Sequence, residues 1–347
     1  MPQTWHLLLA GVLAFSAAAR GGSPSPSNEE SADRTLIVLA APTASDRYYH
    51  PLRREILDFQ VAFAKAILGR DNVVILCDRR TERALSMKLP DDILLEAPMR
   101  DIWTRDFFPV LPDRPALFRY SAAAQGGLQS DADWVQNEFL HVARRLGLAF
   151  QRFPLVLDGG NVVDNGLDQV IVTDRFLEDN LLDKPRAVVL LREMLGVERV
   201  AILPADPEDR LAHADGMAMF IASNTVAVTD FGGRFQKTLR QELRAAFPGV
   251  GIVEIETPFD TPAFDPAFGS AQGIYVNATV TDRFIYLPVY GLESDAKALA
   301  KIRASTEREV VPVDAGAIGQ MGGSVRCLSA QLKGENARRL IEAARKR

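Results

Sequence analysis

Short apolar segments alternate along this chain with segments whose apolar residues recur at helical spacing. Continuous apolar runs, which are typical of buried strands, occupy 35–41, 73–77, 170–173, 200–203, 252–255 and 310–313. Between them, apolar residues recur every three or four positions, as in 52–67. Two pairs of runs predict hairpins, at 217–229 and 274–288. Since a doubly wound parallel sheet has fewer hairpins, the pattern predicts a single α/β domain built from several similar β-α modules.

The first 33 residues differ in character from the rest of the chain. An apolar run over 7–19 is too short to span a bilayer and ends in three alanines, which is typical of a signal peptide. Residues 20–33 are rich in Ser, Pro, Gly and acidic residues, as in flexible linkers. We therefore expect a signal peptide at 1–19, a linker at 20–33 and the folded domain at 34–347. The protein is then secreted or periplasmic and has no membrane span; it is cytoplasmic if the first methionine is a mis-assigned start.

Composition narrows the classes of partner. A net charge of −5 indicates no basic surface for nucleic acid, and four histidines with two cysteines offer no zinc spacing or disulfide framework. Cys77 lies in a predicted strand, where a free cysteine is usually part of the core. We expect no metal, no cofactor and no nucleic-acid partner, and the sequence does not indicate the oligomeric state.

Three motifs that contain acidic residues and one late cysteine stand out. They are WTRD at 103–106, DGGN at 158–161, HADG at 213–216 and GGSVRC at 322–327. The first motif precedes a predicted strand at 107–111, and Cys327 lies in a predicted strand at 324–329. In an extended segment His213 and Asp215, two residues apart, would face the same side. Such side chains at strand ends are commonly parts of functional sites.

Each motif has a structural and a chemical interpretation. Structurally, WTRD is a solvated turn with a local ion pair, DGGN is a tight turn, and the cysteine is core packing. Chemically, two carboxylates suit the planar fork of a guanidinium, and Trp103 suits its flat cationic face. Asp158 would orient His213, while Gly159 and Gly160 would let the backbone approach a ligand. A thiol, a histidine and several carboxylates are together suited to attack on a cationic carbon.

The ordered set of motifs resembles a known family. WTRD, DGGN, H-x-D-G, Tyr275-Val276-Asn277 and the late G-G-x-x-x-C look like those of the agmatine deiminase and Porphyromonas-type peptidylarginine deiminase family, over roughly residues 34–332. This family belongs to the guanidine-modifying, or pentein, superfamily. The resemblance implies a pentein five-bladed α/β propeller of ββαβ-type modules. It also implies metal-free hydrolysis of a guanidinium to a ureido group and ammonia, through a covalent cysteine S-alkylthiouronium.

The resemblance also implies a role for each matching residue. Cys327 is the nucleophile and His213 the general acid and base, while Asp106 and Asp215 hold the guanidinium nitrogens and count as catalytic. The residues implied to bind substrate are Asp106, Asp215, Trp103, Asp158, Gly159, Gly160, Asn161 and Asn277. The implied substrate is a small guanidinium compound, such as agmatine or arginine, or an arginine-containing peptide.

Three positions depart from the family pattern. Arg326 stands where relatives often have His before the nucleophile. Asp158 replaces a Glu that is one methylene longer, which predicts a lost or water-mediated contact with His213. The segment 107–109 (FFP) replaces a T-G-P that is common in agmatine deiminases, which favours a peptidylarginine deiminase-like enzyme.

Other functions are compatible with the same residues. An amidinotransferase or a dimethylarginine hydrolase of the same superfamily would use the same set. The departures at Arg326 and Asp158 leave open a secreted guanidinium-binding protein without turnover. A cysteine protease built on Cys327 and His213 explains neither Asp106 nor Asp215, because a scissile amide carries no cation.

Overall fold

The structure is a computed structural model that describes residues 34–259 and 261–346. Its strands are β1 Leu36–Ala40, β2 Asn72–Cys77, β3 Leu94–Glu96, β4 Ala116–Arg119, β5 Gln151–Val156, β6 Val163–Asp164, β7 Gln169–Thr173, β8 Arg199–Leu203, β9 Ala218–Ala222, β10 Thr225–Thr229, β11 Gly251–Ile255, β12 Thr279–Val280, β13 Phe284–Val289, β14 Glu309–Asp314 and β15 Ala330–Leu332. Its α-helices are α1 Arg53–Ile67, α2 Arg79–Leu85, α3 Thr104–Phe107, α4 Gln129–Leu146, α5 Arg175–Asn180, α6 Lys184–Leu195, α7 Gly233–Ala246, α8 Asp295–Arg303, α9 Gly316–Gly319 and α10 Gly334–Arg345. The predicted α/β class is confirmed.

One pattern of strand pairing recurs in the sheets. In β6–β8, β9–β11 and β12–β14 an antiparallel pair is followed by a helical crossover to a third, parallel strand. Parallel neighbours need such a crossover, and α5–α6, α7 and α8 supply it. The predicted hairpin at 217–229 is the β9–β10 pair. The described strands form five separate sheets, in line with the expected series of similar modules.

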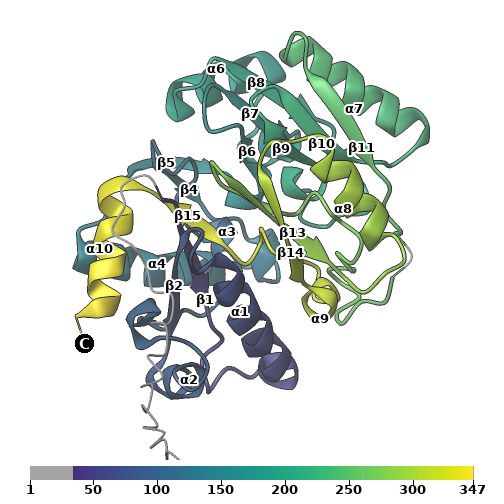
Figure 1. The fold of residues 1–347 in the computed structure, drawn as a ribbon. Coiled ribbons are helices and arrows are strands. Elements are labelled where there is room, and N and C mark those ends of the chain that lie inside the picture. The colour runs from purple at the N-terminus through teal and green to yellow at the C-terminus, as the bar shows by residue number, and fades with distance from the viewer. Residues whose placement is uncertain (1–33, 260, 347) are drawn as a thin grey trace, which may run out of the picture.

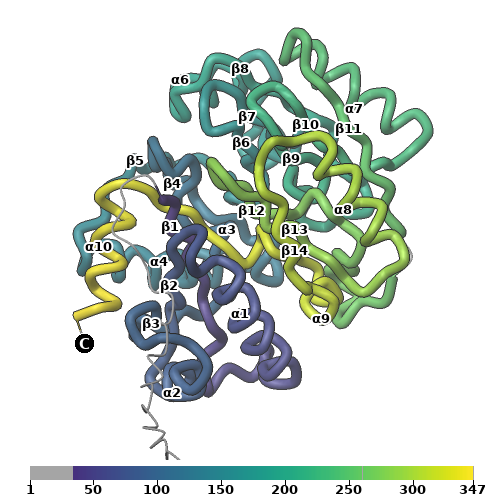
Figure 2. Tube along the Cα trace, viewed as in Figure 1, coloured from purple at the N-terminus to yellow at the C-terminus, as the bar shows by residue number. Residues whose placement is uncertain are grey.

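The two ends of the described chain meet in one sheet. Its strand order is β15-β1-β2-β3; β15 is antiparallel to β1, and α1 links β1 to its parallel neighbour β2. Figure 2 shows the yellow C-terminal strand beside the purple N-terminal strand. The remaining sheet is the parallel pair β4–β5, connected through α4. The C-terminal segment thus completes the module that the N-terminal strand begins.

Apolar packing joins neighbouring modules. Helix α1 buries Ile56, Phe59, Phe63 and Ile67, as its spacing predicts. The Phe63 ring lies 5.7 Å from that of Tyr286 in β13, so the first sheet and the β12–β14 sheet share one core. Helices α6, α7, α8 and α10 lie at the periphery in Figure 1.

The predicted strand at 107–111 is wrong. Residues Thr104–Phe107 form the short helix α3, which the Phe108 N–H closes by donating to the Thr104 carbonyl at 3.2 Å. The run begins inside this helix, because Phe107 is its last residue, and Pro109 adds no N–H that could extend a ladder. Val110 makes only an isolated bridge with Ala116, and the strand of this region is β4.

The predicted strand at 324–329 is also wrong. The Leu328 N–H donates to the Ser324 carbonyl at 3.2 Å and the Ser329 N–H to Arg326 at 3.0 Å, so this segment is a pair of turns before β15. Val325 and Leu328, three residues apart, are both fully buried, which is the spacing of a turn and not of a strand. Of the predicted hairpin at 274–288, only Thr279–Val280 pairs with β13.

The predicted signal peptide (1–19) and linker (20–33) lie outside the described residues. In the part of the chain that is described, no helix combines the length and the apolar character that crossing a membrane requires. The extent of the folded domain and the secreted or periplasmic location stay predictions.

Candidate active site

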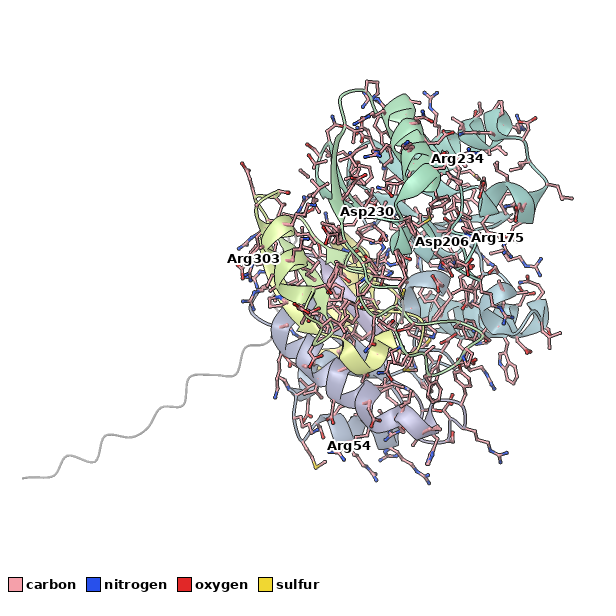
Figure 3. The ribbon with its side chains drawn as sticks, turned by 90° about the vertical axis from the view of Figure 1, so that its right-hand side faces the viewer. Arg54, Arg175, Asp206, Asp230, Arg234 and Arg303 are labelled. Atoms are coloured by element: carbon pink, nitrogen blue, oxygen red, sulfur yellow. The ribbon has the colours of Figure 1, made fainter. Side chains whose placement is uncertain are left out.

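Loops from several modules enclose a cavity of about 910 Å³. The cavity is lined by a thiol, an imidazole and the carboxylates of two of the acidic motifs, WTRD and HADG. Six residues that the sequence singled out line it: Trp103, Asp106, His213, Asp215, Asn277 and Cys327. Asp206, which is labelled in Figure 3 and follows β8, also lines the cavity. The motifs are thus brought together from positions more than 200 residues apart in the chain.

The turn before β15 presents the Cys327 thiol. The Asn277 amide lies against its sulfur, with Nδ2 at 3.2 Å and Oδ1 at 3.3 Å from Sγ. The same amide oxygen accepts the Cys327 backbone N–H at 3.4 Å, and the Arg105 N–H donates to the Cys327 carbonyl at 3.2 Å. Both backbone polar groups of Cys327 are therefore held, and Asn277 fixes the sulfur.

The His213 ring lies between two carboxylates. Its Nε2 is 3.1 Å from Asp158 Oδ2, and its Nδ1 is 3.7 Å from Asp106 Oδ1. Residues Ala214–Gly216 form a short 3₁₀-helix, so the segment is not extended as the alternation argument assumed. His213 and Asp215 nevertheless both line the cavity, because a 3₁₀ turn returns after three residues.

Asp158 contacts His213 directly, which corrects the expectation of a lost or water-mediated contact. Its carboxylate also accepts the Ser121 backbone N–H at 2.7 Å and the Ser121 hydroxyl at 2.6 Å. These bonds hold the shorter side chain where its oxygen reaches the imidazole. Ser121 was missed at the sequence level, because nothing near it marks a site.

Charge in the buried site is concentrated on the imidazole. Burial disfavours a charged His213, but the charge of Asp106, the hydrogen bond to Asp158 and the charge of Asp215 outweigh this and raise its pKa to about 10. Burial raises the pKa of Asp106 to about 7, although His213 opposes that change. At neutral pH the imidazole therefore holds its proton while Asp106 is poised to titrate.

The surroundings of Cys327 oppose ionisation of its thiol. Burial, followed by the charges of Asp215 and Asp106, raises the pKa of Cys327 well above its usual range. Asp215 Oδ2 lies 4.0 Å from Sγ. Two carboxylates near a sulfur oppose a thiolate, and a bound cation would offset them. The site is therefore suited to a positively charged ligand.

Four of the residues implied to bind substrate lie behind the cavity wall: Asp158, Gly159, Gly160 and Asn161. The Gly160 N–H donates to Asp106 Oδ1 at 2.9 Å. Asn161 Oδ1 accepts the N–H groups of Thr173 and Ala214, at 2.8 and 3.2 Å. DGGN therefore supports the side chains of Asp106 and His213, and its direct contact with substrate stays a prediction.

The glycine pairs provide space for the side chains of other motifs. A Cβ on Gly323 would lie 2.4 Å from the Trp103 ring, and one on Gly159 would lie 1.9 Å from the Arg105 carbonyl oxygen. These positions tolerate only glycine because their neighbours are a packed indole and backbone. Both glycine pairs are thus needed for close packing around the cavity.

We expect Gly160→Ala to lower kcat/KM about a hundredfold, because a displacement of about 1 Å in a catalytic group can have that effect. A Cβ at this position would lie 2.5 Å from His213 Nδ1 and 2.7 Å from Asp106 Oδ1. Gly216→Ala is the matched control, since its Cβ would meet no atom within 4 Å. Steady-state kinetics of both variants check this prediction, and equal losses in both would contradict it.

The mouth of the cavity carries features that the sequence did not reveal. Phe231 stacks on Phe259 with ring centroids 5.5 Å apart, and Arg210 lies over the Phe268 ring at 5.2 Å. Phe259 and Tyr48 are about half exposed there. Lone aromatic residues in a loop have no recognisable pattern, so only the folded chain shows that they share one opening.

Among the described residues, no group of three or more His, Cys, Asp or Glu side chains is placed to hold a metal ion.

Comparison with known proteins agrees with this geometry. A Vibrio parahaemolyticus protein named "Putative agmatine deiminase" is 23% identical over 339 residues, which cover 85% of this chain and 93% of that protein. The structure of C. jejuni agmatine deiminase superposes with a TM-score of 0.73 at 18% identity, covering 89% of this chain and 96% of that one. The agmatine deiminase of Enterococcus faecalis gives a TM-score of 0.69 at 19% identity, covering 89% and 94%. At these identities the two structures establish the α/β fold that they share with this chain.

The sequence model of one family, described as Porphyromonas-type peptidyl-arginine deiminase, matches residues 27–332. This range includes every motif that surrounds the cavity and most of the chain. The protein therefore belongs to the Porphyromonas-type peptidyl-arginine deiminase family.

Proposed function

We propose that this protein hydrolyses the guanidinium group of an arginine-like substrate to a ureido group and ammonia, through a covalent intermediate on Cys327. The observation that carries the proposal is the convergence of the Cys327 thiol, the His213 imidazole and the Asp106 and Asp215 carboxylates on a single cavity. Membership of the family makes the protein a hydrolase that acts on guanidino carbon–nitrogen bonds. The residue roles below extend that assignment.

Substrate binding assembles the reactive state. Asp106 and Asp215 accept N–H groups from the planar guanidinium, while Trp103 covers its flat face. The cation offsets the two carboxylates that raise the pKa of Cys327. The thiol can then release its proton to solvent and attack as a thiolate, so ionisation is coupled to the arrival of the correct ligand.

The first chemical step forms a carbon–sulfur bond and breaks a carbon–nitrogen bond. The Cys327 thiolate adds to the central guanidinium carbon and gives a tetrahedral adduct. His213, which holds its proton at neutral pH, gives it to one amino group, and ammonia leaves. The product is an S-alkylthiouronium that still carries one positive charge, which Asp106 and Asp215 continue to hold.

The second step restores the enzyme. Neutral His213 takes a proton from a water molecule as the water oxygen adds to the thiouronium carbon. The carbon–sulfur bond then breaks, the hydroxyl group of the adduct gives its proton to the released ammonia, and the ureido product forms. The departing Cys327 thiolate takes a proton back from solvent. Guanidinium plus water thus becomes a ureido group plus ammonium, and neither a metal nor a redox partner takes part.

We infer that the substrate arginine belongs to a peptide. The cavity of about 910 Å³ lies at the upper end of the volumes typical of small-ligand pockets. Its mouth carries partly exposed aromatic side chains, including Tyr48 and Phe259, that suit residues flanking an arginine. A free guanidinium compound would leave this outer region empty.

We also infer that the five sheets are the blades of an α/β propeller. Three of them repeat one hairpin-helix-strand order, and the pairing of β15 with β1 links the last segment to the first. A ring closed in this way would place the loops of all modules around one central site, as the origin of the cavity residues suggests.

The test is ammonia release from protein of residues 34–347 with agmatine, free arginine, and peptides with C-terminal or internal arginine. We expect release from the peptides, with kcat/KM well above that for agmatine. Higher kcat/KM with agmatine would overturn the peptide assignment alone. Transfer of the amidino group to an added amine, or binding without ammonia release, would overturn hydrolysis.

The pH dependence of kcat/KM should show an acid limb near pH 7. Burial raises the pKa of Asp106 to about 7, so below that pH the protonated side chain cannot hold a cation. Activity should fall about tenfold per pH unit below the limb. In the pH profile of kcat the acid limb should lie at lower pH, because a bound guanidinium favours the charged form of Asp106. Profiles of both parameters check this, and a kcat/KM that stays flat below pH 7 would contradict it.

A further inference from the structure

Arg326 precedes the nucleophile, yet its side chain lies beneath the cavity. The residue is only 6% exposed. One Nη donates to the Val162 carbonyl at 2.7 Å, which anchors the guanidinium, and Nε lies 3.5 Å from Asp215 Oδ2. Its backbone N–H donates to the carbonyl of Asn277, whose side chain holds the thiol. Arg326 therefore contacts both the carboxylate and the residue that position the reaction.

Asp215 depends on compensating charge. Its side chain is 2% exposed, and a buried carboxylate without a nearby cation takes up a proton. Arg326, His213 and Arg105 favour its ionised form, and the carboxylates of Asp209 and Asp106 oppose it. Burial raises the pKa of Asp215, and Arg326 opposes this more than any other group.

The contact leaves the carboxylate available to a ligand. Arg326 Nε is buried and makes no hydrogen bond within the described residues. It attracts the Asp215 carboxylate through charge at 3.5 Å and does not use up a lone pair of either oxygen through a well-formed hydrogen bond. Asn277 donates to the backbone carbonyl of Asp215 and not to its carboxylate. The carboxylate oxygens can thus accept donors from the cavity.

Arg105 does not duplicate this role. It is also buried, but its guanidinium donates to the uncharged amide of Gln331 at 2.9 Å and makes no ion-pair contact with Asp215. Burial, together with the charge of Arg326, lowers its pKa to about 9. Arg326 is therefore the cation in direct contact with this carboxylate.

We propose that Arg326 is a positioning residue that keeps the Asp215 carboxylate ionised and directed into the cavity before the substrate arrives. That Asp215 then receives a guanidinium rests on the proposed function. The charge of Arg326 also balances that of Asp215, whose oxygen lies 4.0 Å from the Cys327 sulfur. The arginine thus lets a carboxylate approach the nucleophile with less opposition to the thiolate.

The experiment measures the ionisation of Asp215 without substrate. In protein carrying ¹³C-labelled aspartate, the Asp215 carboxyl resonance is assigned by its loss in Asp215→Asn. We expect Arg326→Gln to raise the titration midpoint by about one to three pH units, the usual effect of an arginine beside an aspartate. The contribution of Asp215 to the acid side of the kcat/KM profile, which adds to the Asp106 limb, should move the same way, and activity should approach that of the wild type at alkaline pH.

Two further variants separate charge from packing. Arg326→Lys keeps the charge, so the midpoint should stay near that of the wild type. Arg308→Gln removes a partly buried arginine that binds backbone carbonyls of Thr281 and Ile221, and it should leave the midpoint unchanged. Thermal unfolding checks that each variant is folded.

An unchanged Asp215 midpoint in folded Arg326→Gln would overturn the proposal. So would a folded Arg326→Lys whose midpoint moves upward, and this second test holds even if the glutamine variant does not fold. Activity that falls equally at every pH would indicate a packing role only. Absence of ammonia release from the wild type would instead overturn the proposed function, while the carboxyl titration would still decide the role of Arg326.

Discussion

Cys327→Ala should abolish turnover, lowering kcat by at least about 10⁴-fold, because loss of a nucleophile removes the covalent path entirely. The thiol lines the cavity within 3.3 Å of the Asn277 amide and 4.0 Å of Asp215. Alanine removes the sulfur without adding bulk, so the binding residues should stay in place. Ammonia release and intact-protein mass spectrometry of acid-quenched reactions measure the two parts of this prediction: turnover and the covalent adduct.

Cys77→Ala is the matched control for that variant. Cys77 is fully buried in β2 and does not line the cavity. We expect activity to persist, with a loss of about 1 kcal/mol in the free energy of unfolding from the lost packing. In the wild type the adduct should form on the peptide that contains Cys327. Full activity in Cys327→Ala would disprove the covalent mechanism.

Asp215→Asn should impair both activity and stability. The carboxylate proposed to hold the substrate is lost, so kcat/KM should fall about a hundredfold or more. Arg326 is left as a buried charge without its ion-pair partner, and breaking such a pair typically lowers the free energy of unfolding by about 3–5 kcal/mol. Steady-state kinetics and denaturant unfolding measure the two losses.

Asp106→Asn separates these effects. It should lower kcat/KM to a similar extent but leave stability much closer to that of the wild type. Burial raises the pKa of Asp106 to about 7, above its value in the unfolded chain. Any stability that the protonated side chain adds is therefore lost as the pH rises through 7, and at pH 8 the charged carboxylate lowers the stability of the fold. His213 keeps its contact with Asp158. Equal losses of stability in the two variants at pH 8 would contradict this interpretation.

The chemistry of the site was largely readable from local patterns. Three of the four motifs contain residues that line the cavity through their side chains, and the ordered set predicted the family that the comparison confirms. The alternation of apolar runs also predicted the α/β class and the β9–β10 hairpin. Side-chain type and spacing carry this information because they are properties of the chain before it folds.

Backbone conformation around the reactive groups was less predictable. Apolar runs at 107–111 and 324–329 resembled strands, but the first begins inside helix α3 and the second folds into two turns. Short apolar segments do not distinguish a buried strand from a buried turn by periodicity. Strand and turn differ in which partners satisfy the polar groups of the segment, and those partners can be distant in sequence. The Thr104 hydroxyl, for example, contacts the carbonyls of Val38 and Leu328.

The sequence by itself determined which reactive groups the chain carries and the order in which they occur. Only the tertiary structure decided that Ser121 holds Asp158 against His213, and that Arg326 lies under Asp215 and not in the cavity. These contacts join residues up to 111 positions apart, between Asp215 and Arg326. Their distances depend on how whole modules pack, and a change of about one ångström decides whether a carboxylate reaches an imidazole. No local pattern encodes such a distance.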